Sequence, residues 1–131
     1  KFAGLDRRAE VAEARAGVEA ASNLMRATAD ARVGTATAAL ERPGDPSHQD
    51  LRDCHVSFER AAELYGAVGD LADSSRCAAR GDALRNALEG VLGLEKGTRR
   101  LDKGRLGDSV QELWRAEQAL EKALAGERGY W

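Results

Sequence analysis

The residues best suited to hold a metal ion are crowded into one stretch of the chain, His48 to His55. It contains two histidines, Asp50, Asp53 and Cys54, all ligand types that zinc accepts. The two histidines are seven positions apart, or about 10 Å along a helix axis, which is too far for both to reach one ion easily. A second helix would have to supply the missing ligands, and it has no histidine to offer. We therefore expect no metal site and no cofactor.

Two further sequence patterns lack the residue arrangement that catalysis or phosphate binding requires. Because both histidines belong to one predicted helix, no Ser-His-acid or Cys-His arrangement can be built from them. The segment Gly93–Arg100 (GLEKGTRR) has the order Lys-Gly-Thr, whereas a phosphate-binding loop needs Gly-Lys-Ser/Thr after a strand. The many carboxylates lie on polar faces, where pairing with Arg or Lys explains them. We expect no enzymatic activity and no catalytic residue.

A basic cluster near the third predicted corner is the strongest charge signal: Lys96, Arg99, Arg100, Lys103 and Arg105. Most members are three or four positions apart and so share one helical face. Such a face suits phosphoinositide headgroups, an anionic membrane surface or an acidic partner helix. The alternative is a solvated face with cations near a helix C-terminus. The net charge of −2 argues against a large lipid-binding face and against nucleic acid as a partner.

Hydrophobic periodicity predicts four helices and no strand. The first three are expected at about Ala3–Glu41, Ser47–Ala67 and Leu71–Lys103. The fourth follows a corner at Gly104–Gly107, with Asp108 as a possible cap, and ends at AGERGYW. Short corners place sequential helices antiparallel. The predicted fold class is therefore all-α, an antiparallel bundle of about four helices in the order long-short-long-short, forming a single domain over residues 1–131.

Local signals set the helix boundaries. Pro43 and Pro46 end the first helix, and Ser47 with Asp50 resembles a capping box for the second. Gly34 predicts a kink or an early end in the first helix. One continuous third helix is the preferred interpretation. The glycines in Gly93–Gly97 make a break of that helix the alternative.

Two of the corners are alike. The glycine, leucine and serine of Gly69–Ser74 recur 35 positions later in Gly104–Ser109. This spacing resembles the tetratricopeptide repeat, whose period is about 34 and which would imply helical hairpins lining a binding groove. Arg100 stands where Tyr65 stands in the first unit, and two units are fewer than such arrays need. A plain bundle with two similar corners is the favoured interpretation.

The two cysteines and the first residues of the chain indicate the cellular compartment. Cys54 lies 15 positions before Gly69 and Cys77 lies 8 after it. That mismatch is about 10 Å along a helical hairpin and exceeds the reach of a disulfide. Free thiols predict a reducing, intracellular and cytoplasmic location. No apolar signal core or membrane-spanning run is present, and a chain beginning at Lys1 is expected to be a segment of a longer protein.

The expected function is a non-catalytic protein–protein interaction or scaffolding module. It would bind a partner helix or peptide in a groove between its helices. Large aromatic residues dominate interfaces, so the candidate contact residues are Tyr65, Trp114, Tyr130 and Trp131. The alternative is that Tyr65 belongs to the core and the C-terminal aromatics cap the bundle.

A second interpretation is an elongated dimer that binds a membrane surface. Val11, Val18 and Met25 are spaced by sevens, with Ala14 and Ala21 three positions after the first two. This pattern is a coiled-coil seam that suits a homodimer interface, and it suits packing within the chain equally well. The basic cluster would then face anionic lipid.

Overall fold

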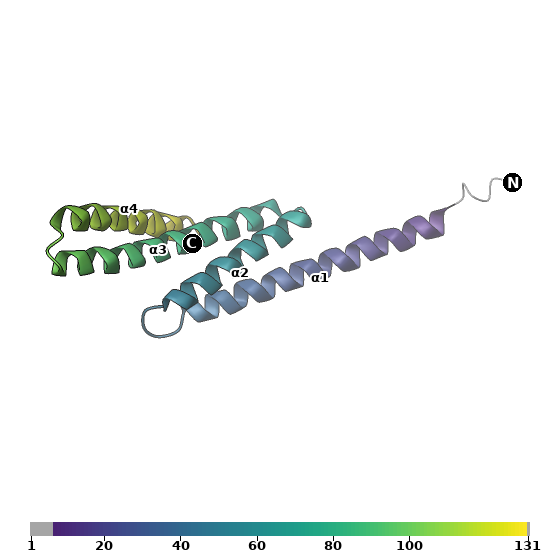
Figure 1. Cartoon of the computed structure of the whole chain (residues 1–131). Coiled ribbons are helices and arrows are strands. Elements are labelled where there is room, and N and C mark those ends of the chain that lie inside the picture. The colour runs from purple at the N-terminus through teal and green to yellow at the C-terminus, as the bar shows by residue number, and fades with distance from the viewer. Residues whose placement is uncertain (1–6, 131) are drawn as a thin grey trace.

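The computed structural model describes the backbone of residues 7–130 and the side chains of residues 7–126. This part of the chain forms four α-helices and no strand. The helices are α1 (Arg8–Leu40), α2 (His48–Ala67), α3 (Leu71–Asp102) and α4 (Leu106–Tyr130). The fold is the predicted all-α antiparallel four-helix bundle. Its helices pack mainly in chain order, α1 on α2, α2 on α3 and α3 on α4, which gives an elongated molecule (Figure 1).

The start of α2 confirms the predicted capping box. The Ser47 hydroxyl accepts a hydrogen bond from the Asp50 N–H, and the Asp50 carboxylate accepts one from the Ser47 N–H, both at 3.0 Å. Hydrogen bonding to the Asp50 carboxylate lowers its pKa, first by the Ser47 backbone N–H and then by the Ser47 side chain. Ser47 is therefore the cap residue, and α2 begins at His48, one position after the predicted start.

The two similar corners have the same geometry. Gly69 and Gly104 adopt positive φ angles of 82° and 74°, which glycine tolerates best. Ser74 and Ser109 each donate a side-chain hydrogen bond to the carbonyl twelve residues earlier, at 2.8 and 3.0 Å. The interval between the corners holds one helix, α3, whereas a tetratricopeptide unit holds a helix pair. The likeness to that repeat is thus confined to the corners.

The structure tests three predicted helix boundaries. The α3 helix is continuous through Gly93–Gly97, as preferred, and α1 is continuous through Gly34, so the predicted early end there is wrong. The predicted corner at Gly104–Gly107 is too long and Asp108 is not the cap, because α4 begins at Leu106. Glycine in a helix costs only about 1 kcal/mol, which packing elsewhere on the helix offsets.

The core lies where α1, α2 and α3 meet. Phe58 lies at the centre of this core, and its side chain is 1% exposed. The Arg80 guanidinium lies 5.9 Å from the centroid of the Phe58 ring. Small residues on α1, Ala29 and Ala36, let α2 approach closely. The other buried members of this core are Leu51, Cys54, Ala61, Ala62, Tyr65, Cys77 and Leu84.

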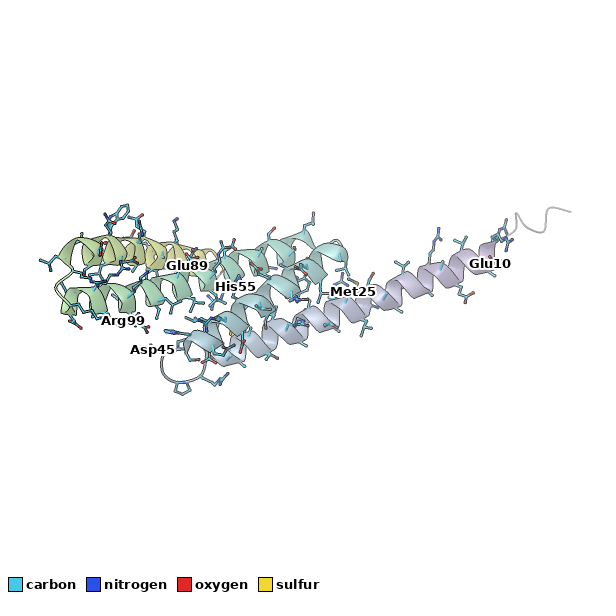
Figure 2. All side chains as sticks on the ribbon, in the orientation of Figure 1. Glu10, Met25, Asp45, His55, Glu89 and Arg99 are labelled. Atoms are coloured by element: carbon cyan, nitrogen blue, oxygen red, sulfur yellow. The ribbon has the colours of Figure 1, made fainter. Side chains whose placement is uncertain are left out.

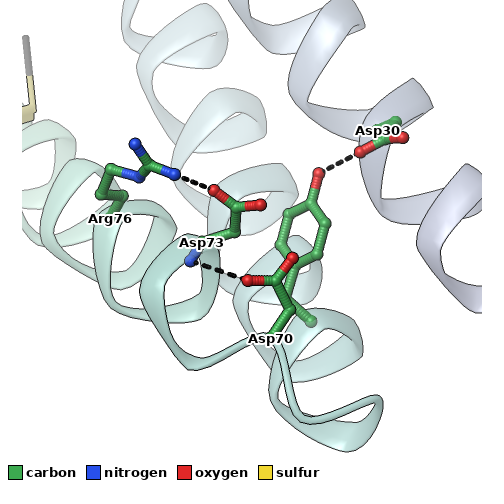
Figure 3. A network of polar contacts seen from close by, with 5 residues as sticks. Asp30, Asp70, Asp73 and Arg76 are labelled. Atoms are coloured by element: carbon green, nitrogen blue, oxygen red, sulfur yellow. Dashed lines mark hydrogen bonds and ion pairs between the residues drawn. The ribbon is translucent and has the colours of Figure 1, made fainter.

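A hydrogen bond joins α1 to α2 at the edge of this core. The Tyr65 hydroxyl donates to the Asp30 carboxylate (Figure 3). Burial, and then this bond, raise the pKa of Tyr65. At the adjacent corner, Asp70 caps α3 by accepting from the Asp73 N–H at 3.3 Å, and Asp73 pairs with Arg76. These contacts fix the α2–α3 corner beside α1.

Tyr65→Phe should therefore lower the free energy of unfolding by about 1 to 2 kcal/mol at neutral pH. Because the folded-state pKa is raised, Tyr65 stays neutral in the fold while the unfolded residue ionises above about pH 10. The stability that Tyr65 contributes should thus be complete at pH 7 and fall as the pH rises beyond 10. Urea unfolding of both proteins at pH 7 and 11 measures this difference, and a difference that is the same at both values would contradict the assignment.

Candidate interaction site

The α3–α4 hairpin is packed unusually closely because glycines of α3 face α4. A Cβ atom built on Gly97 would lie 2.7 Å from the Leu113 side chain, and one on Gly90 would lie 2.5 Å from Leu120. Gly93 faces Ala116 in the same way, with a gap of 3.2 Å. The glycines thus let the larger leucines of α4 sit against the α3 backbone.

One side of this hairpin is an open apolar groove of about 350 Å³. Its lining residues are Leu94 of α3 and Leu113, Ala116, Glu117, Leu120, Glu121 and Leu124 of α4. Leu94 is 47% exposed and Leu124 is 55% exposed, although both are large and apolar. The two glutamates are the charged members of the lining. This arrangement can accept an apolar helix face flanked by basic residues.

Sequence reasoning did not assign the groove residues to a site. The spacing of Leu113, Leu120 and Leu124 places them on one face of α4, which is the sequence signal for this side of the groove. The contribution of Leu94 depends on how α3 and α4 are aligned, which follows from the position of the Gly104 corner and the glycines opposite α4. The pairing of the two helices therefore creates the groove.

The predicted aromatic contact residues separate into three cases. Trp114 is exposed on α4, next in sequence to Leu113, which lines the groove. Tyr65 lies in the core with its hydroxyl bonded to Asp30, so its ring is not presented at the surface. The side chains of Tyr130 and Trp131 lie outside the described residues.

The basic cluster is divided by contacts with α4. Lys96 Nζ and Arg100 Nη1 both approach Glu112 Oε1, at 3.6 and 3.2 Å. Arg99, Lys103 and Arg105 are exposed around the α3–α4 corner, and Figure 2 shows Arg99 on this end of α3. The cations that remain available to a partner are therefore fewer than the sequence suggested.

The histidines link α2 to α3. His48 Nε2 lies 3.0 Å from Glu95 Oε1, and His55 Nδ1 lies 2.8 Å from the Gly81 carbonyl, to which it must donate. Within residues 7–126 no group of three or more His, Cys, Asp or Glu side chains is placed to hold a metal ion. The stretch that suggested metal chemistry thus serves helix pairing.

Both cysteines are free, as their spacing about Gly69 predicted, and both are buried. The Cys54 thiol donates to the Ala36 carbonyl of α1 at 3.6 Å. Burial is the largest cause that raises the pKa of each thiol, followed by nearby aspartates. A raised pKa keeps the thiols protonated and weakly reactive at neutral pH.

The predicted coiled-coil seam lies on a part of α1 that extends beyond α2 (Figure 1). Val18 is 66% exposed, Val11 is also exposed, and Met25 is half-buried where α2 ends. The structure therefore leaves the seam open over most of its length.

None of the helices within residues 7–130 combines the length and the apolar character needed to cross a membrane. No protein-family model matches the chain, and no curated protein or solved structure matches it either.

Proposed function

We propose that this protein is a non-catalytic interaction module that binds an amphipathic partner helix in the α3–α4 groove. The observation that carries the proposal is the groove itself, in which leucines of both helices remain half-exposed around a hollow of about 350 Å³. Contiguous exposed apolar surface on a folded protein commonly marks a binding site.

The form and charge of the groove define its partner. A helix lays apolar residues into such a groove at i, i+3, i+4 and i+7 spacing. Glu117 and Glu121 would favour Lys or Arg beside that apolar face and would disfavour acidic helices. Trp114, exposed beside the groove, would extend the contact. The preferred partner is therefore a basic amphipathic helix.

A fluorescently labelled leucine–lysine helical peptide tests this proposal by anisotropy titration. Leu94→Glu and Leu124→Glu should each weaken its binding by about tenfold or more, because a buried unpaired carboxylate replaces an apolar contact. Both positions are half-exposed, so the fold should tolerate the change.

Val56→Glu supplies the matched control, since Val56 is equally exposed but lies on α2, outside the groove lining. It should bind the peptide as the wild type does. Equal affinity of the wild type and the Leu94→Glu and Leu124→Glu variants would contradict the proposal, as would a failure of the wild type to bind.

A second candidate is a membrane-surface function of the α3–α4 corner. Leu101 and Leu106 are exposed there beside Lys103 and Arg105, a combination that suits an anionic bilayer interface. On this hypothesis, wild-type protein should co-sediment with phosphatidylserine vesicles at low salt, and Lys103→Glu with Arg105→Glu should abolish this. A lack of co-sedimentation by the wild type at low salt would rule this candidate out.

A further inference from the structure

The apolar stripe of α4 continues beyond the groove towards the α3–α4 corner. Leu106 and Val110 precede Leu113 at spacings of four and three, so all three lie on one face of the helix. Ser109 turns to α3 instead, where its hydroxyl donates to the Gly97 carbonyl. Leu106 and Val110 are exposed, and neither belongs to the groove lining. The helix therefore presents further apolar side chains past the end of the groove.

The register of the hairpin brings Leu101 of α3 to the same place. Gly97 lies against Leu113, and the two helices run antiparallel (Figure 1). Leu101 lies four positions after Gly97, so it is level with Ser109 and next to Val110. It also follows the leucine that α3 contributes to the groove by seven positions, and so shares its face. Both helices therefore extend the groove towards the corner.

Trp114 completes this extension, because it lies four positions after Val110 and is its neighbour on the helix surface. We call Leu101, Leu106, Val110 and Trp114 the corner patch. Its side chains are between 48% and 66% exposed, and none of them is charged. Contiguous exposed apolar surface marks interaction sites, and tryptophan is enriched among the residues that dominate binding energy.

We infer that the helix bound in the groove also covers the corner patch, and that its basic residues are confined to the half that lies over Glu117 and Glu121. This inference rests on the proposed function and defines its partner further. The groove part of α4, Leu113 to Leu124, is about 17 Å long, whereas the whole stripe from Leu106 is about 27 Å long. The partner is thus a helix of about five turns, not three.

The charges of the hairpin set this asymmetry. Glu117 and Glu121 line the groove, so lysines of a partner gain a pairing there. A lysine held over the uncharged corner patch would lose hydration without gaining a partner. Lys96 and Arg100 pair with Glu112, which lies two positions from Val110 and so on the opposite face of α4. An uncharged apolar helix half therefore fits the patch better than a layer of anionic headgroups.

Two labelled peptides of equal length, about 21 residues, test the inference by anisotropy titration. Both carry a leucine stripe flanked by lysines in one half. In the full-stripe peptide the leucines continue between glutamines through the other half, and in the half-stripe peptide glutamines replace those leucines. Wild-type protein should bind the full-stripe peptide about tenfold or more tightly, because the corner patch is then covered. A third peptide, with a full stripe and lysines in both halves, should bind more weakly than the full-stripe peptide, and equal or tighter binding would overturn the charge asymmetry.

The double variant Leu101→Gln with Val110→Gln should remove this gain and bind the half-stripe peptide as the wild type does. Val56→Gln, at an exposed valine of α2, is the matched control and should keep the gain. A full-stripe peptide that binds the wild type no tighter than the half-stripe peptide would overturn this inference alone, as would a gain that the double variant retains. Failure of both peptides to bind would overturn the proposed function with it. Loss of co-sedimentation with phosphatidylserine vesicles in the double variant, without any peptide gain in the wild type, would assign the patch to a membrane instead.

Discussion

Phe58→Ala is expected to lower the free energy of unfolding by about 3 to 5 kcal/mol. Phe58 is 1% exposed in the core where α1, α2 and α3 meet. Removing its ring would leave a cavity that the surrounding helices can fill only in part, and it would also remove the surface on which the Arg80 guanidinium lies. Since domains of this size are commonly stable by about 5 to 15 kcal/mol, the change should be a large fraction of the total.

Urea unfolding followed by circular dichroism at 222 nm measures this loss. Val56→Ala is the matched control, because Val56 lies two positions away on α2 and is exposed, so its removal should change stability by less than about 0.5 kcal/mol. Similar values for the two variants would show that Phe58 is not at the centre of the core.

Gly97→Val should lower the free energy of unfolding by about 1 to 3 kcal/mol through overpacking. Even a single Cβ at this position would lie 2.7 Å from the Leu113 side chain and 3.3 Å from the Leu113 backbone nitrogen. The leucine can rotate, but the backbone cannot yield without moving α4. Valine has a slightly better helix propensity than glycine, and this gain is smaller than the steric cost.

Gly34→Val isolates the steric part of that effect. Gly34 is also inside a helix, and no atom lies within 4 Å of a Cβ built on it. The substitution there should leave stability unchanged or raise it by a few tenths of a kcal/mol. If thermal unfolding showed equal changes at both positions, the close approach of α3 and α4 would be refuted.

Signals between near neighbours in the sequence were sufficient to predict the helices and most of their ends. The Ser47–Asp50 capping box involves groups three residues apart, and the Gly69 and Gly104 corners depend on the conformational freedom of one residue. The predictions failed where a glycine was read by itself. Gly34 does not end α1, because a single glycine weakens a helix without ending it.

Only the tertiary structure decided which faces meet. Glu112 draws Lys96 and Arg100 out of the predicted basic cluster because the Gly104 corner places it opposite them, and Leu94 joins the groove for the same reason. Tyr65 looked like a contact residue but is buried, since α1 supplies Asp30 for its hydroxyl. The sequence by itself determined the helices, most of their caps and the spacing of the apolar seam on α1, because these depend on residues a few positions apart, whereas the exposure of that seam depends on where α2 ends. The core, the groove and the projecting end of α1 depend on register between helices, which no local pattern encodes.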